Sequence, residues 1–252
     1  MGKVYLVGAG PGDIELLTLK AYKLIKVADV ILYDRLINKE ILNLRKAGCK
    51  LVYVGKECGN HIVEQDKINE LLLKYANTND VVVRLKGGDP FIFGRGGEEA
   101  LFLASHDIEF EVVPGVSSIT AAPAYAGIPL TFRGISSSFA VITGHEDTKK
   151  KHSNIDWQSL KEIDTLIFLM AVSNRQKIAK NLIEIGRSYD EPVAFIEKGT
   201  TPHQKTTITT LLELAYNPPN VEPPALMIVG QVVRLREYIL NLKGDIDKEI
   251  NF

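Results

Sequence analysis

The chain has 252 residues, of which 45% are apolar and 24% charged, and 30 basic against 31 acidic residues give a formal net charge of −1. This composition is typical of a globular protein with one large α/β domain or two smaller ones, and it excludes an overall basic surface for nucleic acid. The cysteine usage, the absence of a signal peptide and the lack of any apolar run of roughly 18 to 20 residues predict a cytoplasmic protein without a membrane segment.

A buried strand is predicted at 4–7, and the loop Gly8-Ala-Gly-Pro-Gly-Asp13 follows it. The loop does not match the dinucleotide fingerprint G-x-G-x-x-G, because Asp13 stands where the third glycine belongs. Pro11 also lacks the backbone N–H that a pyrophosphate would use. The loop is therefore expected to be either a rigid wall of a ligand site or a plain tight turn.

A surface helix over 18–27 and strands at 30–33 and 51–54 come next. Asp34 and Arg35 follow the first of these strands, at the end where open α/β sheets bind ligands. Asp34 is thus either the cap of a helix near 39–44 or a catalytic carboxylate. Lys56 follows the other strand and is either a solvated loop lysine or a residue of the site.

The most informative stretch is the glycine-rich loop over 86–99. It follows a predicted buried strand at 80–85, and its last two residues, Glu98 and Glu99, lie in the first turn of a predicted helix. Its five glycines let the backbone come close to a ligand. No Gly-Lys-Ser/Thr sequence follows them, so a triphosphate is not expected. Asp89 could accept hydrogen bonds from a ribose or an amino group, and the run Phe91-Ile-Phe93 is expected to be buried.

The remaining chain continues the α/β alternation, which is typical of a parallel sheet. A strand is predicted at 110–113, and a helix of small residues follows it. Ser117 or Ser118 either caps this helix or, as a small residue, leaves room for a flat ligand. Further strands are predicted at 138–143, 165–170, 192–196 and 224–230, with a helix at 174–186. We predict an N-terminal α/β domain over 1–115, a connecting segment over 116–137 and a C-terminal α/β domain over 138–252. The five scattered histidines form no metal motif, so no metal is expected.

Taken together and in order, these segments resemble the uroporphyrinogen-III C-methyltransferases of the tetrapyrrole methylase family. The similarity spans about residues 3 to 233, and its most specific parts are the loop over 84–99 and the run over 126–131. The other matching segments are Gly8–Asp13, Tyr33–Arg35, Val54–Lys56, Val113–Val116, Ile142–His145, Met170, Glu197–Thr201 and Pro224–Gly230.

The resemblance implies two α/β domains with S-adenosyl-L-methionine in the cleft between them, and a homodimer. It implies that Asp34 is a proton acceptor and Lys56 a proton donor. Phe132 stands where the family usually has histidine, which puts a substrate-side role at that position in doubt. The implied cofactor contacts are Pro11, Gly87, Gly88, Asp89, Ile92, Ser117, Ser118, Met170, Gly199 and Ala225.

The resemblance also implies the reaction, which is methylation of uroporphyrinogen III at two pyrrole carbons to give precorrin-2 via precorrin-1, for sirohaem or cobalamin biosynthesis. S-adenosyl-L-homocysteine is the by-product. The substrate carries eight carboxylates, so basic loop residues are expected around it, namely Arg35, Arg84, Lys86, Arg95 and Arg133. The alternatives are a related methylase of a later corrinoid precursor and a nucleotide-binding protein without turnover.

Overall fold

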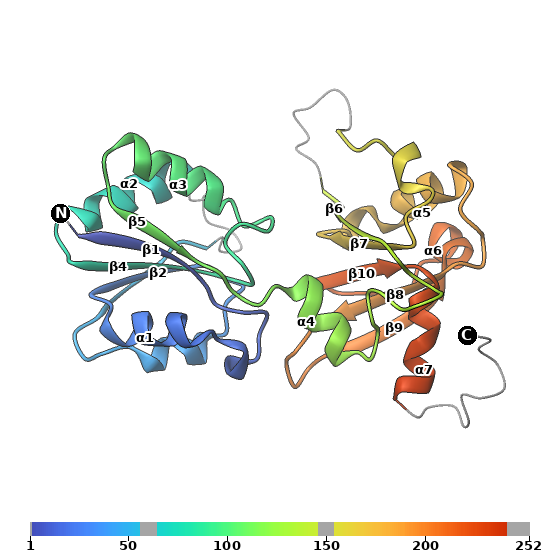
Figure 1. The fold of residues 1–252 in the computed structure, drawn as a ribbon, viewed down its shortest axis with the longest axis horizontal. Coiled ribbons are helices and arrows are strands. Elements are labelled where there is room, and N and C mark those ends of the chain that lie inside the picture. The colour runs from blue at the N-terminus through green and yellow to red at the C-terminus, as the bar shows by residue number, and fades with distance from the viewer. Residues whose placement is uncertain (1, 56–64, 146–153, 241–252) are drawn as a thin grey trace. The chain divides into compact units, whose positions relative to one another are not determined.

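The computed structural model describes residues 2–55, 65–145 and 154–240 (Figure 1). The chain divides into two compact units, Met1–Ser117 and Ser118–Phe252, and each contains its own five-stranded sheet. The predicted connecting segment 116–137 includes helix α4 (Ser118–Tyr125) of the second unit. No helix in the described part of the chain is long and apolar enough to cross a membrane.

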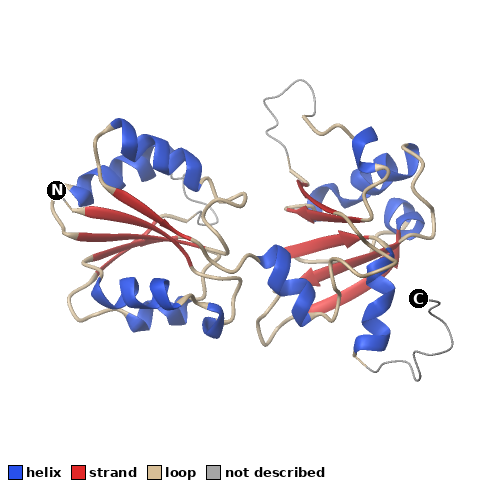
Figure 2. Ribbon diagram, in the orientation of Figure 1, coloured by secondary structure: helices blue, strands red, loops and turns tan. Residues whose placement is uncertain are grey.

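The N-terminal unit has an all-parallel sheet with the strand order β3-β2-β4-β1-β5. Its β-branched strands are covered by helices on both faces, as parallel sheets require (Figure 2). The strands are β1 (Lys3–Gly8), β2 (Val30–Tyr33), β3 (Lys50–Tyr53), β4 (Val81–Lys86) and β5 (Phe110–Val113). The helices are α1 (Leu19–Val27), α2 (Gln65–Ala76) and α3 (Gly96–Ser105), with 3-10 turns η1 (Ile14–Leu16) and η2 (Lys39–Leu44).

Strand β4 shows how side-chain alternation divides this unit into two cores. Val83 and Leu85 pack in the core on the α1 side, whereas Val82 packs with Leu72 and Leu103 on the α2 and α3 side. Because successive side chains of a strand point to opposite faces, Arg84 and Lys86 belong to the same face as Val82. Two cations of the central strand are therefore directed towards the layer formed by α2 and α3.

The C-terminal unit has a mixed sheet with the order β6-β7-β10-β8-β9, in which only β6 and β7 are parallel. This pairing differs from the parallel sheet that continued α/β alternation suggested. The strands are β6 (Phe139–Thr143), β7 (Thr165–Leu169), β8 (Pro192–Glu197), β9 (Lys205–Thr210) and β10 (Ala225–Val229).

Two layers of helix cover this second sheet. One core is formed with α5 (Arg175–Glu184) and α6 (Leu211–Tyr216), and the other with α4 and the 3-10 turn η5 (Gln231–Leu235). The short elements η3 (Gln158–Leu160), η4 (Val172–Asn174) and α7 (Arg236–Ile239) complete the described part of the unit. Gly186 follows the end of α5 and has φ of 97°, the left-handed conformation in which a glycine commonly ends a helix.

Candidate active site

The carboxyl ends of all five strands of the N-terminal unit lie at one edge of its sheet, because the strands are parallel. Five sequence-predicted positions follow these ends: Pro11 after β1, Asp34 and Arg35 after β2, the loop 87–92 after β4, and Ser117 after β5. Lys56, the predicted proton donor, lies outside the described residues.

Three glycines bring the loops after β1, β4 and β5 into backbone contact, and we call Gly8, Gly88 and Gly115 the glycine junction. A Cβ at Gly115 would lie 2.2 Å from the carbonyl oxygen of Gly88, and a Cβ at Gly8 would lie 2.5 Å from the Cα of Gly115. Gly10 and Gly88 exchange two backbone hydrogen bonds of 3.2 and 2.7 Å. The junction leaves no room for a side chain, so backbone lines this edge.

Asp89 fixes the same junction with its carboxylate. Its Oδ2 accepts a hydrogen bond of 3.0 Å from the Gly115 amide, and its Oδ1 accepts one of 2.8 Å from the Phe91 amide. Each oxygen has further lone pairs, so a ligand contact is compatible with these bonds. Asp89 therefore orders the loop in addition to any role towards a cofactor.

The prediction that Phe91-Ile-Phe93 is buried is wrong, since all three side chains are exposed, Phe91 by 57%. The Gly96 amide donates to the Pro90 carbonyl over 3.0 Å and closes the base of the loop. Between these two residues, Phe93 and Arg95 have positive φ of 49° and 59°, a backbone conformation that is uncommon outside glycine and typical of turns. Ile92, a predicted cofactor contact, lies on this exposed tip.

A chain of charged side chains lies beneath the same edge, and we call Asp34, Arg84, Lys86 and Glu99 the charge cluster. Arg84 Nη2 donates to both carboxylate oxygens of Asp34, over 2.9 and 3.0 Å. Arg84 Nε donates to Glu99 Oε1 over 3.0 Å, and Lys86 Nζ donates to the same oxygen over 2.9 Å. Two cations and two carboxylates thus form one connected group that extends from the interior to the edge.

Burial decreases along this group towards Asp34. The side chains of Glu99, Arg84 and Lys86 are 0%, 2% and 3% exposed, whereas that of Asp34 is 29% exposed. Burial by itself lowers the pKa of Arg84, but the charges of Glu99 and Asp34 outweigh it and raise the pKa, so the guanidinium stays charged. Burial and the neighbouring Arg84 lower the pKa of Lys86.

The structure separates the two sequence-based readings of Asp34. The turn η2 is capped by Asn38, whose side chain accepts a hydrogen bond of 2.9 Å from the Glu40 amide. Asp34 does not cap this turn, and its carboxylate is held by Arg84 at the sheet edge. The catalytic interpretation of Asp34 therefore has a geometric basis, although its role stays a prediction.

Arg84 and Lys86, predicted to contact the substrate, are buried and neutralised by protein carboxylates. This burial argues against a direct contact with substrate. The exposed predicted cations are Arg35 and Arg95 in this unit and Arg133 in the other, and Arg95 pairs with Glu98 over 2.6 Å. Sequence reasoning missed Glu99, although its place four residues before the buried Leu103 put it on the apolar face of α3.

The C-terminal unit gathers its predicted residues at one edge of its own sheet. Met170 follows β7, Gly199 follows β8, and Ala225 begins β10, which runs antiparallel to both strands. Met170 has φ of 57°, and Lys198 and Thr200 on either side of Gly199 have φ of 47° and 66°. Backbone held in this region by non-glycine residues is concentrated at functional sites. Ser118 is the first residue of α4.

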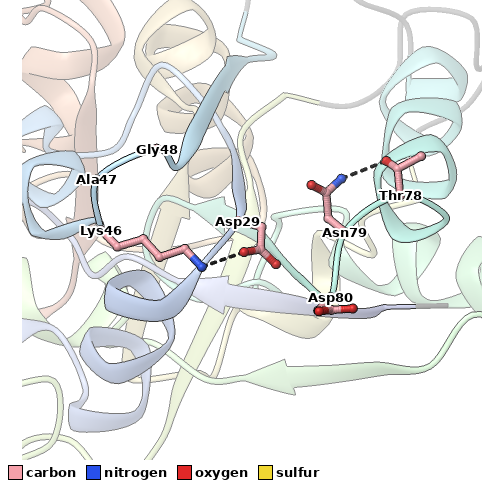
Figure 3. A pocket seen from close by; sticks show the side chains of 7 residues that line it. All are labelled: Asp29, Lys46, Ala47, Gly48, Thr78, Asn79 and Asp80. Atoms are coloured by element: carbon pink, nitrogen blue, oxygen red, sulfur yellow. Dashed lines mark hydrogen bonds and ion pairs between the residues drawn. The ribbon is translucent and has the colours of Figure 1, made fainter.

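A polar hollow in the N-terminal unit lies away from these residues, at the opposite edge of the first sheet, where β2 and β4 begin (Figure 3). Asp29 Oδ1 accepts from Lys46 Nζ over 2.6 Å, and Asp29 Oδ2 accepts from the Val81 amide over 2.9 Å. Asn79 donates to Thr78 Oγ1 over 2.8 Å. These bonds tie the chain together where β2, β3 and β4 start, which is a structural role.

This role predicts a pH-dependent loss of stability in Asp29→Asn. The Lys46 ammonium and the Val81 amide hold the pKa of Asp29 below its usual value. A lowered pKa stabilises the fold at neutral pH, and this contribution is lost as the pH falls below about 4. Urea unfolding should therefore show a less stable variant at pH 7, and the difference from the parent should shrink under acid. A constant difference at both pH values would contradict the assignment.

The described residues contain no group of three or more His, Cys, Asp or Glu side chains that could hold a metal ion. The charge cluster combines carboxylates with cations, which is an arrangement suited to holding a carboxylate in place. A backbone-lined edge with one partly exposed, fixed carboxylate can bind a small ligand and accept a proton from it.

A family model described as Tetrapyrrole (Corrin/Porphyrin) Methylases matches residues 3–215. An S-adenosyl-L-methionine-dependent uroporphyrinogen III methyltransferase of Methanosarcina barkeri is 48% identical over 249 residues, or 98% of each chain. A siroheme synthase of Yersinia enterocolitica is 49% identical over 237 residues, which are 94% of this chain and 50% of that protein.

Among solved structures, a uroporphyrin-III C-methyl transferase from Thermus thermophilus complexed with S-adenosyl homocysteine is similar to this chain. It has a TM-score of 0.81 and 46% sequence identity, and the match covers 93% of this chain and 94% of that one. The predicted fold class, two α/β domains of this type, is confirmed by that similarity together with the two sheets described above.

Proposed function

Because the chain belongs to the tetrapyrrole (corrin/porphyrin) methylase family, we propose that it is an S-adenosyl-L-methionine-dependent uroporphyrinogen-III C-methyltransferase. It methylates two pyrrole carbons and yields precorrin-2 via precorrin-1, a precursor of sirohaem and cobalamin, with S-adenosyl-L-homocysteine as by-product. The observation that carries this conclusion is the identity of 48% over nearly the whole of both chains to an enzyme of that name.

The residues of the N-terminal unit fit an adenosyl ligand. The glycine junction presents backbone rather than side chains, and a Cβ at Gly87 would lie 3.2 Å from the Cβ of Leu36, so this loop too has little room for bulk. We propose cofactor contacts in this unit at Pro11, Gly87, Gly88, Asp89, Ile92 and Ser117, and in the C-terminal unit at Ser118, Met170, Gly199 and Ala225. The bound sulfonium supplies an activated methyl group.

Asp34 is the proposed proton acceptor. Attack of a pyrrole carbon on a methyl group leaves a cationic ring, and a proton must then leave the macrocycle. A carboxylate fixed at a sheet edge can stabilise that cation and take the proton. The bond to Arg84 holds the Asp34 carboxylate in one orientation before the substrate arrives. Lys56 is proposed as the proton donor on the basis of the resemblance alone.

Binding of the polycarboxylate substrate is assigned to exposed arginines. Arg35, Arg95 and Arg133 are exposed, and a guanidinium can bind a carboxylate through two parallel hydrogen bonds. Arg95 has its geometry defined by Glu98 and by its own positive φ. The resemblance further supports a homodimer. Net charge, cysteine usage and the lack of a long apolar run support a cytoplasmic protein that binds neither nucleic acid nor membrane, and we include these features in the proposal.

The decisive test is a mass assay with uroporphyrinogen III and S-adenosyl-L-methionine under anaerobic conditions. We expect the tetrapyrrole to gain two methyl groups in sequence, with one equivalent of S-adenosyl-L-homocysteine released for each. No gain on this substrate, together with a gain on a later corrinoid precursor, would replace the substrate assignment. Binding of S-adenosyl-L-homocysteine without methyl transfer to any tetrapyrrole would instead indicate a non-catalytic nucleotide-binding protein.

A further inference from the structure

We propose that Glu99 is a positioning residue for Asp34, and that it acts through Arg84. The inference rests on the proposed role of Asp34 as proton acceptor and adds to it a fully buried residue of the charge cluster. Glu99 lies in α3 and is fully buried, so it does not itself contact substrate. Its effect on the reaction must therefore be transmitted through other side chains.

The guanidinium of Arg84 is the part that transmits this effect. Its Nε is bound to Glu99, its Nη1 donates to the Leu85 carbonyl over 3.3 Å, and its Nη2 is bound to Asp34. A guanidinium is planar and rigid, so fixing Nε and Nη1 on the interior side determines where Nη2 lies. Nη2 in turn contacts both oxygens of Asp34, which fixes the plane of that carboxylate.

Glu99 is itself held from more than one side. Its Oε1 accepts hydrogen bonds from Arg84, from Lys86 over 2.9 Å and from Gln65 Nε2 over 3.2 Å. Its Oε2 is buried and has no hydrogen-bond partner among the described residues. All of its described hydrogen bonds are therefore concentrated on the one oxygen that contacts Arg84. An isolated carboxylate would be costly to bury, so this placement depends on the two cations.

Its neighbour Glu98 shows the contrast. Glu98 and Glu99 are both in the first turn of α3, where negative charges complement the helix dipole. Glu98 is exposed and pairs with Arg95, whereas Glu99 turns inward to the charge cluster. The fold thus directs the Glu99 carboxylate inward to Arg84 and Lys86, a placement that the helix dipole does not require.

The test is a double-mutant cycle with Glu99→Gln and Asp34→Asn. Glutamine has nearly the same volume but no charge, so the charge-assisted hydrogen bonds from Arg84 and Lys86 become weaker and the Arg84 guanidinium is held less firmly. Because small misplacements of a reacting group are costly, we expect Glu99→Gln to lower kcat about 10- to 100-fold. The KM for uroporphyrinogen III and the Kd for S-adenosyl-L-homocysteine should stay within about twofold, since Glu99 contacts neither ligand.

The cycle distinguishes positioning from a general structural role. Asp34→Asn should lower kcat on the order of 10²- to 10⁴-fold, the range for a lost proton acceptor. If Glu99 acts through Asp34, adding Glu99→Gln to that variant should lower kcat by less than about threefold, whereas independent effects would multiply. Multiplying losses, or an unchanged kcat in Glu99→Gln alone, would overturn the inference and leave the proposed function intact. An unchanged kcat in Asp34→Asn would refute the proposed role of Asp34 itself.

Two further variants control for the possibility that Glu99→Gln loses activity only because it folds poorly. Glu111→Gln removes an acid of the same unit whose partners are Lys3 and Lys20, so its kcat should match the parent. Arg84→Lys keeps the positive charge but cannot bridge Asp34 and Glu99. Arg84→Lys should therefore lose kcat to a similar extent, with binding of S-adenosyl-L-homocysteine retained. Full activity in Arg84→Lys would overturn the inference even if Glu99→Gln failed to fold.

Discussion

Replacing Gly115 with alanine is expected to lower the free energy of unfolding by about 3 kcal/mol or more and to abolish binding of S-adenosyl-L-homocysteine. The new Cβ would lie 2.2 Å from the Gly88 carbonyl oxygen and 2.7 Å from the Cα of Gly8. Both neighbours are backbone atoms, which cannot rotate away as a side chain can. Relief requires the loops to separate, and that also breaks the bond from the Gly115 amide to Asp89.

The matched control is Gly97→Ala in the first turn of α3. A Cβ there meets nothing within 4 Å. Since alanine favours helix over glycine, this variant should be as stable as the parent or up to about 1 kcal/mol more stable. Urea unfolding gives the stability of both variants, and calorimetric titration with S-adenosyl-L-homocysteine gives the affinity. If Gly115→Ala had the stability and the affinity of the parent, the loops of the glycine junction would be able to move apart at little cost, contrary to this prediction.

The second large effect is expected in the C-terminal unit, where Arg187→Met should cost about 3–5 kcal/mol. Arg187 is buried, and its Nε donates to Glu191 over 2.8 Å. Its Nη1 also donates to the carbonyl oxygens of Leu160, Lys161 and Ile163, over 2.8, 3.2 and 2.8 Å. The substitution leaves a buried carboxylate unpaired and removes the donor that fixes the segment before β7.

An exposed arginine of the same unit provides the comparison. Arg234 lies near Asp190, at 3.7 Å between Nη2 and Oδ2, and both side chains are largely exposed. Arg234→Met should therefore cost less than about 1 kcal/mol. Adding Glu191→Leu to Arg187→Met should restore part of the lost stability, because it removes the unpaired charge. If urea unfolding showed the same loss of free energy of unfolding for Arg187→Met and Arg234→Met, the burial of Arg187 would not explain its effect.

Much of the fold is predictable because its strands are short β-branched runs that are separated by helices. The predicted strand at 80–85 corresponds to β4 at Val81–Lys86, and the helix at 174–186 contains α5. The antiparallel pairing of the second sheet is not predictable in this way. Strand β10 inserts between β7 and β8, and local patterning carries no information on such a long-range partner.

The candidate site shows the same division between local and long-range information. Asp34 and the glycine-rich loop can be proposed from the sequence because they directly follow strands. Arg84 and Lys86 are predicted to be substrate-binding loop residues because they adjoin the glycine-rich loop, but strand alternation directs them to the helical layer. The assignment of Phe91–Phe93 to the interior failed because it depended on apolarity alone, while Pro90, Phe93 and Arg95 set the direction of the chain.

The glycine junction has a consequence for recombining relatives of this family. The loops after β1, β4 and β5 meet backbone to backbone and are joined by Asp89. If one loop were exchanged for that of a distant homologue, its backbone would have to fit against two loops with which it did not evolve. The three loops are far apart along the chain but depend on one another for their packing. A chimaera of two family members should therefore take all three loops from the same parent.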